Sequence, residues 1–341
     1  MAPFVSIVMP CYNERHFIEA CLAGVLTQDY PKDRLEVLVT DGMSDDGTRA
    51  ILFRLAKEDP RIRIIDNPDR LQAPGMNRAI KAARGEIVMR MDVHAEYASD
   101  YVSQCVRVLE ETGADNVGGS ARPRADTPFR RALCAALDSF LAVGGSKYRS
   151  ADEEGYVDTV FLGTFRRRLF ERVGLYDPKA ITNEDAELNQ RIREQGGSVY
   201  LSRDIVAYYY PRDSFRSLAK QYWKYGQGRA RTLLKHGKPQ LRPMTPFLFV
   251  AGSVALVAMP SLRWLSPLWF GGYALATFAE AVRIGVKHDM PSEIPRIWAI
   301  FPILHVSHGA GFARGLLHYL QNPDWEDPEL LPSAPAAPAS P

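Results

Sequence analysis

The chain has 341 residues, of which 46% are hydrophobic and 24% charged, and its formal net charge is +2. These fractions are typical of a folded protein and exclude a largely disordered one, and the length allows a catalytic domain with an appended segment. The near-neutral charge excludes the strongly basic surface that nucleic-acid binding requires, so we expect no nucleic-acid partner. The four cysteines lack CxxC spacing and are expected to be reduced thiols.

The first two hundred residues alternate between short β-branched runs and helical patterns. The predicted strands are Val5–Met9, Glu36–Asp41, Arg61–Asp66 and Glu86–Asp92. The predicted helices between and after them are Glu14–Gln28, Gly47–Glu58, Pro74–Arg84 and Ser99–Glu111. Near-continuous apolar strands separated by helices indicate an α/β fold: a Rossmann-like, mostly parallel sheet with helices on both faces. Such sheets bind ligands at the carboxyl ends of their strands.

The alternation is weaker in the next segment, after Arg122. The pattern there predicts helices at Phe129–Leu141, from Glu184 onward and at Phe215–Lys235, and strands at Ser198–Ser202 and Ile205–Tyr209. A tail of proline, alanine and serine ends the chain and predicts disorder. We therefore predict a catalytic domain over residues 1–240, hydrophobic membrane-associated helices over 241–325 and a disordered tail over 326–341.

Three apolar stretches follow residue 243, namely Phe247–Leu262, Leu265–Ala279 and Ile297–Leu320. The first two are uncharged and slightly shorter than the roughly 20 residues of a spanning helix. Basic residues flank this pair and aromatic residues lie at its edges, which favours a membrane hairpin with both flanks in the cytoplasm. The alternative is a pair of buried helices in a soluble helical domain. The third stretch is typical of an interfacial or re-entrant helix.

Polar and aromatic residues follow the first two predicted strands. The first strand ends in Pro10–Glu14, where the Tyr12 ring can stack on a nucleobase or simply serve packing. The second strand ends in Asp41, and Gly42–Thr48 follows with glycines that permit close ligand approach and polar residues that can cap a helix. No GxGxxG motif follows the first strand, which counts against a dinucleotide-binding dehydrogenase.

Two further motifs contain paired titratable residues. Asp92 and His94 end the fourth predicted strand, and their spacing puts both side chains on one side of an extended chain. A carboxylate and an imidazole suit Mn²⁺ or Mg²⁺ bridging a diphosphate, with histidine favouring Mn²⁺. Glu184 and Asp185 follow Asn183 at the start of a helix, where capping and the helix dipole explain all three. Paired acids can also supply a general base.

Taken together, these motifs resemble the family 2 glycosyltransferases, which have the GT-A fold. The resemblance extends from about Val5 to Arg231. The family's opening nucleotide-binding motif is matched by Pro10, Tyr12, Asn13 and Glu14. Asp41 matches the acid that holds the uracil of UDP, which implies a UDP-sugar donor.

The resemblance also implies roles for the paired acids. Asp92 and His94 occupy the DxD position, which binds the nucleotide sugar and a divalent metal, with His94 replacing the second aspartate. Glu184 and Asp185 match the ED motif, in which Asp185 is the catalytic base. The implied cofactor is therefore Mn²⁺ or Mg²⁺.

A degenerate QxxRW element follows at Lys220–Tyr225. The residues that the resemblance assigns to the donor and acceptor region there are Gln221, Lys224 and Tyr225. Because Lys and Tyr replace the Arg and Trp of this element, the resemblance favours the addition of a single sugar over processive synthesis. Arg70 and Asn77, after the third predicted strand, are candidate nucleotide contacts, although a turn and a helix start also explain them.

The resemblance implies an inverting hexosyltransferase that moves one sugar from a UDP-sugar to a lipid-linked saccharide acceptor. Phe161–Arg167 and the hydrophobic C-terminal block are similar to bacterial enzymes of exopolysaccharide synthesis of the succinoglycan type. We therefore expect the bacterial cytoplasmic membrane as the location, with the catalytic domain in the cytoplasm. The alternatives are a polyprenyl-phosphate sugar synthase, which loads the lipid phosphate itself, and a non-catalytic nucleotide-sugar-binding protein.

Overall fold

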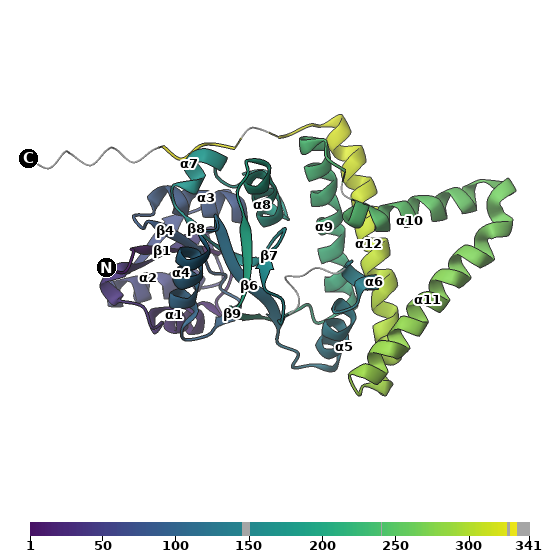
Figure 1. Cartoon of the computed structure of the whole chain (residues 1–341), viewed down its shortest axis with the longest axis horizontal. Helices are drawn as coiled ribbons and strands as arrows, with labels where there is room; N and C mark the ends of the chain where they lie inside the picture. The colour runs from purple at the N-terminus through teal and green to yellow at the C-terminus, as the bar shows by residue number, and fades with distance from the viewer. Residues whose placement is uncertain (145–150, 240, 326–327, 333–341) are drawn as a thin grey trace, which may run out of the picture. The chain divides into compact units, whose positions relative to one another are not determined.

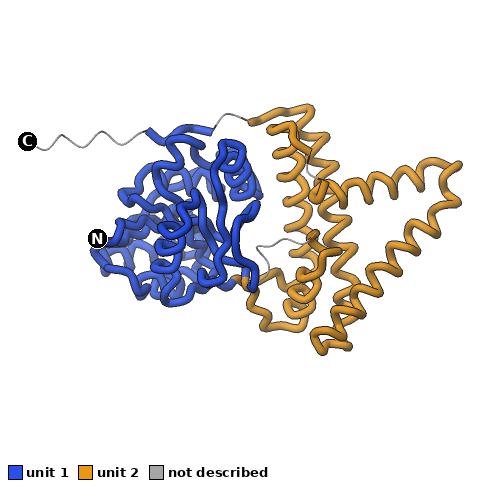
Figure 2. Tube along the Cα trace, in the orientation of Figure 1, with its two compact units in different colours: residues 1–121, 151–208, 326–341 blue, residues 122–150, 209–325 orange. Residues whose placement is uncertain are grey.

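The computed structural model describes residues 1–144, 151–239, 241–325 and 328–332. The chain forms two compact units, which Figure 2 colours separately. Unit 1 comprises residues 1–121, 151–208 and 326–341, and unit 2 comprises residues 122–150 and 209–325. Each unit is therefore assembled from segments that are not contiguous in the sequence.

Unit 1 is built on a nine-stranded sheet in the order β3-β2-β1-β4-β8-β6-β9-β5, with β7 paired to β9. Figure 1 labels β1, β4, β8, β6 and β9 of this sheet. Its parallel half consists of β1 (Val5–Cys11), β2 (Leu35–Asp41), β3 (Ile62–Asp66) and β4 (Ile87–Arg90). The register places Asp41 opposite both Cys11 and Asp66, so these strands end at one edge. The predicted α/β fold with these four strands is confirmed.

The other half of the sheet contains β5 (Ala95–Tyr97), β6 (Asn116–Pro123), β7 (Gly155–Tyr156), β8 (Phe161–Arg166) and β9 (Val199–Tyr209). β8 runs antiparallel to both β4 and β6, so the sheet is mixed. The sequence pattern predicted two strands where β9 is continuous, and it missed β6 and β8. Gly118 and Gly119 interrupt the apolar pattern of β6, and the register shifts between Val117 and Gly119.

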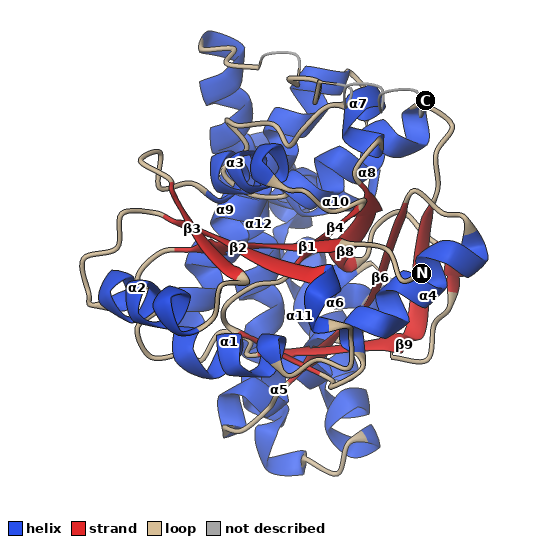
Figure 3. Ribbon diagram, turned by 90° about the vertical axis from the view of Figure 1, so that its left-hand side faces the viewer, coloured by secondary structure: helices blue, strands red, loops and turns tan. Residues whose placement is uncertain are grey.

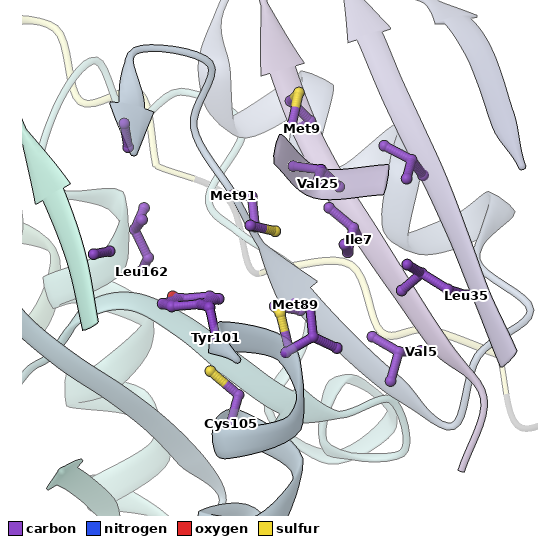
Figure 4. Close-up of a cluster of buried hydrophobic side chains, with 14 of the residues drawn as sticks. Val5, Ile7, Met9, Val25, Leu35, Met89, Met91, Tyr101, Cys105 and Leu162 are labelled. Carbon is purple, nitrogen blue, oxygen red and sulfur yellow. The ribbon is translucent and has the colours of Figure 1, made fainter. Parts of the chain in front are cut away.

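Helices cover both faces of this sheet. They are α1 (Ile18–Leu26), α2 (Thr48–Glu58), α3 (Gln72–Ala82), α4 (Tyr101–Thr112), α7 (Leu169–Val173) and α8 (Glu184–Glu194), with a 3₁₀ turn η1 (Lys32–Arg34). Figure 3 shows α3 on one side of the parallel strands and α1 and α2 on the other. Alternate residues of β1, Ile7 and Met9 among them, join Val25 of α1 and Tyr101 of α4 in the core cluster of Figure 4. Burying each such large side chain stabilises the fold by about 1.5–3 kcal/mol.

Unit 2 is helical, and its helices are α5 (Pro128–Leu137), α6 (Phe140–Val143), α9 (Phe215–His236), α10 (Leu241–Ala258), α11 (Ser266–Lys287) and α12 (Ile294–Gln321). Two 3₁₀ turns, η3 (Pro260–Leu265) and η4 (Pro291–Glu293), connect α10 to α11 and α11 to α12. α9 and α12 pack closely because glycines line their contact. A Cβ atom at Gly226 would lie 2.6 Å from the Phe312 backbone nitrogen, and one at Gly315 would lie 2.9 Å from the Ala230 Cβ.

The two units divide the chain differently from the predicted boundaries. α5 and α9 fall within the predicted catalytic domain of residues 1–240, yet they pack against α12 in unit 2. Part of the predicted disordered tail, residues 328–332, is also ordered, because the Leu331 N–H donates to the Phe170 carbonyl (3.1 Å) and the Leu331 side chain is buried. Residues 326–327 and 333–341 of that tail lie outside the described residues.

Among the described helices, α10 alone is long and apolar enough to cross a membrane. Its mean hydropathy is 1.5 over 18 residues, and only 6% of that window is buried inside the protein. The two apolar stretches that the sequence presented as a matched pair therefore differ in the structure, where the second belongs to the longer helix α11.

Candidate active site

Hydrogen bonds join the loops that follow β1 and β2. Asn13 adopts the left-handed backbone conformation (φ 56°), which asparagine tolerates better than most residues. Its N–H donates to Ser44 Oγ (2.9 Å), and its side-chain amide exchanges hydrogen bonds of 2.9 and 3.1 Å with Asp45. The Glu14 N–H donates to Thr48 Oγ1 (2.9 Å). Asn13 and Glu14 thus set the shape of this edge through their backbone and amide groups.

Asp41 lies at the end of β2 and is completely buried. Its carboxylate accepts a hydrogen bond from Arg49 Nη1 (2.6 Å) and faces the Ser44 N–H, which lies 3.3 Å from each oxygen. Arg49 also donates to Asp66 at the end of β3 (2.7 Å). One arginine of α2 therefore links the ends of two neighbouring strands and orients the Asp41 carboxylate.

Tyr12 is the exposed aromatic residue of this edge, with 41% of its surface accessible. Gly42 allows its ring to lie against the β2 loop, because a Cβ atom at Gly42 would come within 2.9 Å of Tyr12 Cδ2. The Arg70 guanidinium lies 5.8 Å from the ring centroid, within range of a cation–π contact. Pro10, in β1, lies opposite Thr40 of β2 and supports the start of this loop. The structure therefore brings Tyr12, Arg70 and the Asp41 loop together.

Asn77 has a different position in the structure. Its Nδ2 donates to the Tyr176 carbonyl (2.8 Å), and its Oδ1 accepts from the Tyr176 N–H (2.9 Å). Both ends of the amide are therefore used to fasten α3 to the segment before α8. Asn77 is therefore not available for the predicted nucleotide contact.

His94 lies just beyond β4, and its side chain is 56% exposed. Its Nδ1 lies 3.4 Å from Glu14 Oε1. Among the residues that the structure describes, no group of three or more His, Cys, Asp or Glu side chains is placed to hold a metal ion. A metal at this edge would therefore have to complete its coordination with oxygens from a substrate or from water, as Mg²⁺ commonly does.

The centre of the site is Arg90, the last residue of β4. Its guanidinium donates from Nε and Nη2 to the two oxygens of Asp92 (2.9 and 3.1 Å). Nη1 donates to both oxygens of Asp185 (2.6 Å each) and to Glu184 Oε1 (3.2 Å). The structure thus brings Asp92, Glu184 and Asp185 around one cation, although two of these acids lie more than ninety positions beyond Arg90.

Burial and charge perturb the acids of this cluster in opposite directions. Burial raises the pKa of Glu184, and the neighbouring Asp185 raises it further. Burial would also raise the pKa of Asp92, but the charge and hydrogen bonds of Arg90 hold it below its ordinary value. The pKa of Arg90 lies well above its ordinary value because, against the effect of burial, three carboxylates stabilise the cation. Strong perturbation of buried acids is typical of functional sites.

Helix α8, which presents Glu184 and Asp185, is held by two buried polar contacts. Arg191 pairs with Glu187 one turn earlier (2.8 Å) and donates to the Leu175 carbonyl (2.9 Å). Asn189 accepts from Asn116 Nδ2 on β6 (2.7 Å). Because buried polar groups are costly when unpaired, these contacts specify one position for the helix and therefore for its first turn.

The donor and acceptor region expected from the degenerate QxxRW element lies on α9, in unit 2. Gln221 Nε2 donates to Tyr225 Oη (2.9 Å), one turn further along this helix. Lys224 lies on the same helix, one residue before Tyr225. The acids of the cluster all belong to unit 1.

The sequence patterns did not identify Arg90, Arg49 and Gln72 as site residues. Gln72 begins α3, and its amide satisfies both neighbours when its nitrogen faces Glu184 Oε1 at 3.2 Å and its oxygen faces Arg90. A signal for Arg90 was present, because a charged residue inside an apolar strand is rarely buried without a partner. Arg90 also lies two positions before Asp92, and strand geometry puts both on the same side.

The fold of the chain is of the GT-A type. A solved structure with similar fold is the mannosyltransferase PcManGT from Pyrobaculum calidifontis, in complex with GDP-Man and Mn²⁺. Its TM-score is 0.63 at 22% identity, and the match covers 93% of this chain and 88% of that chain.

Sequence comparison defines the family. The family model "Glycosyl transferase family 2" matches residues 6–174. The succinoglycan biosynthesis protein ExoA of Rhizobium meliloti is 34% identical over 316 residues, which cover 92% of this chain and 95% of ExoA. A dolichyl N-acetyl-alpha-D-glucosaminyl phosphate 3-beta-D-2,3-diacetamido-2,3-dideoxy-beta-D-glucuronosyltransferase of Methanococcus voltae is 27% identical over 322 residues, covering 92% of this chain and 97% of that protein. The chain belongs to glycosyltransferase family 2.

Proposed function

We propose that the protein transfers one sugar, with inversion, from a UDP-sugar to a lipid-linked saccharide acceptor during synthesis of a cell-surface polysaccharide. The observation that supports this most directly is the cluster in which Asp92, at the carboxyl edge of the sheet, and Asp185, at the start of α8, are both bound to Arg90. The donor diphosphate, at Asp92, and the general base for the acceptor, Asp185, would then lie on either side of one guanidinium. The similarity to ExoA over nearly the whole chain supports the polysaccharide assignment.

In this proposal, the nucleotide binds at the edge formed by the loops after β1 and β2. The Tyr12 ring stacks on the uracil, and the buried Asp41 carboxylate accepts a hydrogen bond from its N3–H. Arg70, beside the Tyr12 ring, is within reach of the same nucleotide. Because PcManGT was solved with GDP-Man, guanine is the alternative to uracil as the nucleobase of the donor. A UDP donor is proposed here on the resemblance that assigns Asp41 to uracil.

A divalent metal fits the donor end of this site. His94 is well exposed, and Asp92 has about four lone-pair positions, so it can keep its bonds to Arg90 and still offer an oxygen. Glu14, 3.4 Å from His94 Nδ1, is placed to orient the imidazole in the way that carboxylates orient metal-bound histidines. When bound, Mn²⁺ or Mg²⁺ would neutralise charge on the diphosphate leaving group. PcManGT was solved with Mn²⁺.

Asp185 is the proposed general base. Its side chain is 32% exposed, whereas that of Glu184 is only 9% exposed, so Asp185 is the acid that an acceptor hydroxyl can reach. It would take the hydroxyl proton as the oxygen attacks the anomeric carbon from the face opposite the diphosphate, which inverts the configuration. Glu184, whose pKa is raised by burial and by Asp185, is the less accessible neighbour of the base.

The acceptor side of the proposal depends on unit 2. Helix α10 is apolar and almost entirely unburied, and exposed apolar surface of this size marks a membrane or partner contact. Leu248, Val254 and Val257 of α10, with Leu268 of α11, are each more than half exposed. We propose that these helices hold the enzyme at the cytoplasmic face of the bacterial membrane, where a lipid-linked acceptor is available. The acceptor named for the Methanococcus relative is likewise a dolichyl-linked sugar phosphate.

The function is tested by measuring nucleotide release and sugar transfer by the full chain. UDP-sugars and GDP-sugars are compared, each with and without Mn²⁺, in the presence of membrane lipid extract. Transfer from a UDP-sugar to a lipid-linked saccharide supports the proposal. Transfer to polyprenyl phosphate itself would identify the synthase alternative, and nucleotide binding without any release would identify a non-catalytic binding protein.

The membrane assignment needs its own test, because α9 packs against α12 and removing the C-terminal helices would expose it. We therefore change two exposed apolar residues, as Val254→Glu with Leu268→Glu, and use Leu330→Glu, which is 56% exposed in unit 1, as the control. The double variant should lose its binding to vesicles and keep metal-dependent nucleotide release, and the control should behave as the parent. A parent protein that does not bind vesicles contradicts this part of the proposal.

A further inference from the structure

Arg90 is an unexpected residue for its position. It ends a four-residue strand whose side chains are all buried, and only 5% of its own side chain is exposed. A guanidinium taken out of water loses its hydration, so it persists in such a position only where ionised partners and hydrogen bonds compensate. The partners here are three carboxylates, and each of them belongs to the site proposed above. The fold of β4 alone does not require a cation at this position.

The geometry of the guanidinium explains why arginine fits. One edge, formed by Nε and Nη2, meets both oxygens of Asp92, and the remaining nitrogen, Nη1, lies 2.6 Å from both oxygens of Asp185. The planar fork can therefore hold two carboxylates in a fixed mutual orientation, which a lysine ammonium on a flexible stem cannot do.

The contact leaves part of Asp185 available. A carboxylate has about four lone-pair positions, and Nη1 occupies the region between the two oxygens. With about a third of the side chain exposed, the outward positions can accept a proton from an acceptor hydroxyl while the inward ones stay bound to Arg90. Without the cation, three neighbouring acids would repel one another, and the first turn of α8 would be pushed away from β4.

We propose that Arg90 is the positioning residue of the transfer reaction: it fixes the catalytic base Asp185 at a set distance from Asp92, so that base and donor diphosphate face the same anomeric carbon. This inference rests on the proposed function, in which Asp185 is the base. With its amide nitrogen facing Glu184 and its oxygen facing Arg90, Gln72 at the start of α3 would keep the guanidinium in its plane. A displacement of about 1 Å between reacting groups can lower turnover by about 10²-fold.

The test compares Arg90→Gln and Arg90→Lys with the parent, using turnover at saturating donor and donor affinity measured by calorimetry. Turnover of Arg90→Gln should fall by about 10²-fold, because the base is no longer held in place. Donor affinity should fall by less than about tenfold, since Tyr12 and Asp41 hold the nucleotide base away from Arg90. Arg90→Lys should recover only part of the turnover.

A double-mutant cycle separates positioning from a general effect on folding. If Arg90 acts through Asp185, Arg90→Gln should change the residual turnover of Asp185→Asn by less than about threefold. Low concentrations of guanidinium ion, below the unfolding transition, should restore part of the turnover of Arg90→Ala. Arg231→Ala is the matched control, because Arg231 is equally buried (4% exposed) and paired with Asp324, but it belongs to unit 2 and takes no part in holding α8. Its loss of activity should follow its loss of folded protein and should not respond to guanidinium.

The outcomes distinguish the two levels of the proposal. If the parent enzyme releases no nucleotide from any sugar donor, the proposed function itself fails. If the parent is active and Arg90→Gln keeps its turnover or loses only donor affinity, then Arg90 is not the positioning residue. The same conclusion follows if the turnover losses of Arg90→Gln and Asp185→Asn simply multiply in the double variant.

Discussion

The assignment of the base can be tested by Asp185→Asn, a change that keeps the shape of the side chain. The amide introduced by this change would have one oxygen in place of the two that accept from Arg90 Nη1 at 2.6 Å. It could not accept a proton from an acceptor hydroxyl. Loss of a general base typically lowers turnover by about 10²–10⁴-fold. At 1.36 kcal/mol per factor of ten, this is an increase of about 2.7–5.4 kcal/mol in the activation free energy.

The same substitution should change stability only slightly. Arg90 keeps its ion pairs with Asp92 and Glu184, and the Asp185 side chain is about one-third exposed, so the loss is about 1 kcal/mol or less. Removing its charge also relieves repulsion with Glu184, whose pKa is raised by burial and by this neighbour. For a chain of this size, the melting temperature should therefore shift by less than about 4 °C.

Turnover, donor affinity and melting temperature are measured on the same preparation. Asp204→Asn is the control, because Asp204 pairs with Arg107 on the surface of unit 1, with 52% of its side chain exposed. The control should keep full turnover. If folded Asp185→Asn binds the donor and retains more than about half of the parent turnover, then the base assignment is wrong, and the acids of the first turn only complement the helix dipole.

Other features give predictions of the same kind. His94→Ala should weaken nucleotide binding only in the presence of Mn²⁺, and a parent affinity that is unchanged by Mn²⁺ and by chelators would contradict the metal site. Because the pKa of Glu184 is raised in the native state, the native state binds the Glu184 proton more tightly than the unfolded chain does. The stabilisation from this tighter binding is present below the ordinary pKa of 4.5 and is lost as the pH rises through the raised pKa. Glu184→Gln, which fixes the neutral form, should therefore melt above the parent at about pH 8 and match it near pH 4. Gly226→Ala should destabilise the protein by about 1–3 kcal/mol, because the added Cβ would meet the backbone of α12, whereas Gly24→Ala, in open space on α1, should stabilise it by up to about 1 kcal/mol. Thermal unfolding of both glycine variants checks this, and equal effects would contradict the close packing of α9 on α12.

The sequence by itself determined the parallel half of the sheet and the edge at which the site lies. Val5–Cys11 and Leu35–Asp41 are apolar runs that end in polar residues, and the carboxyl ends of parallel strands lie at a common edge. This rule placed Asp41 at the site without any knowledge of distant contacts. Asp92, two residues beyond the end of β4, was placed by the same reasoning.

Local sequence patterns predicted the structure less well where a residue type is required by a tertiary contact. β6 lacks a continuous apolar pattern because Gly118 and Gly119 allow the backbones of β8 and β9 to approach closely, and no sequence period records that approach. Similarly, α5 and α9 have helical patterns that do not reveal which helix they pack against. Their assignment to unit 2 depends on contacts with α12, which follows more than fifty residues after α9.

Only the tertiary structure decided the centre of the site. Arg90 and Asp185 are separated by 95 positions, and neither the strand period nor the helix period relates residues at that distance. Their contact forms because β4 pairs with β8 while Asn189 and Arg191 hold α8 in one position, so the first turn of α8 reaches the end of β4. The sequence contains the cation and the three acids, but the long-range packing of α8 is what brings opposite charges together in a buried place where each is costly without the other.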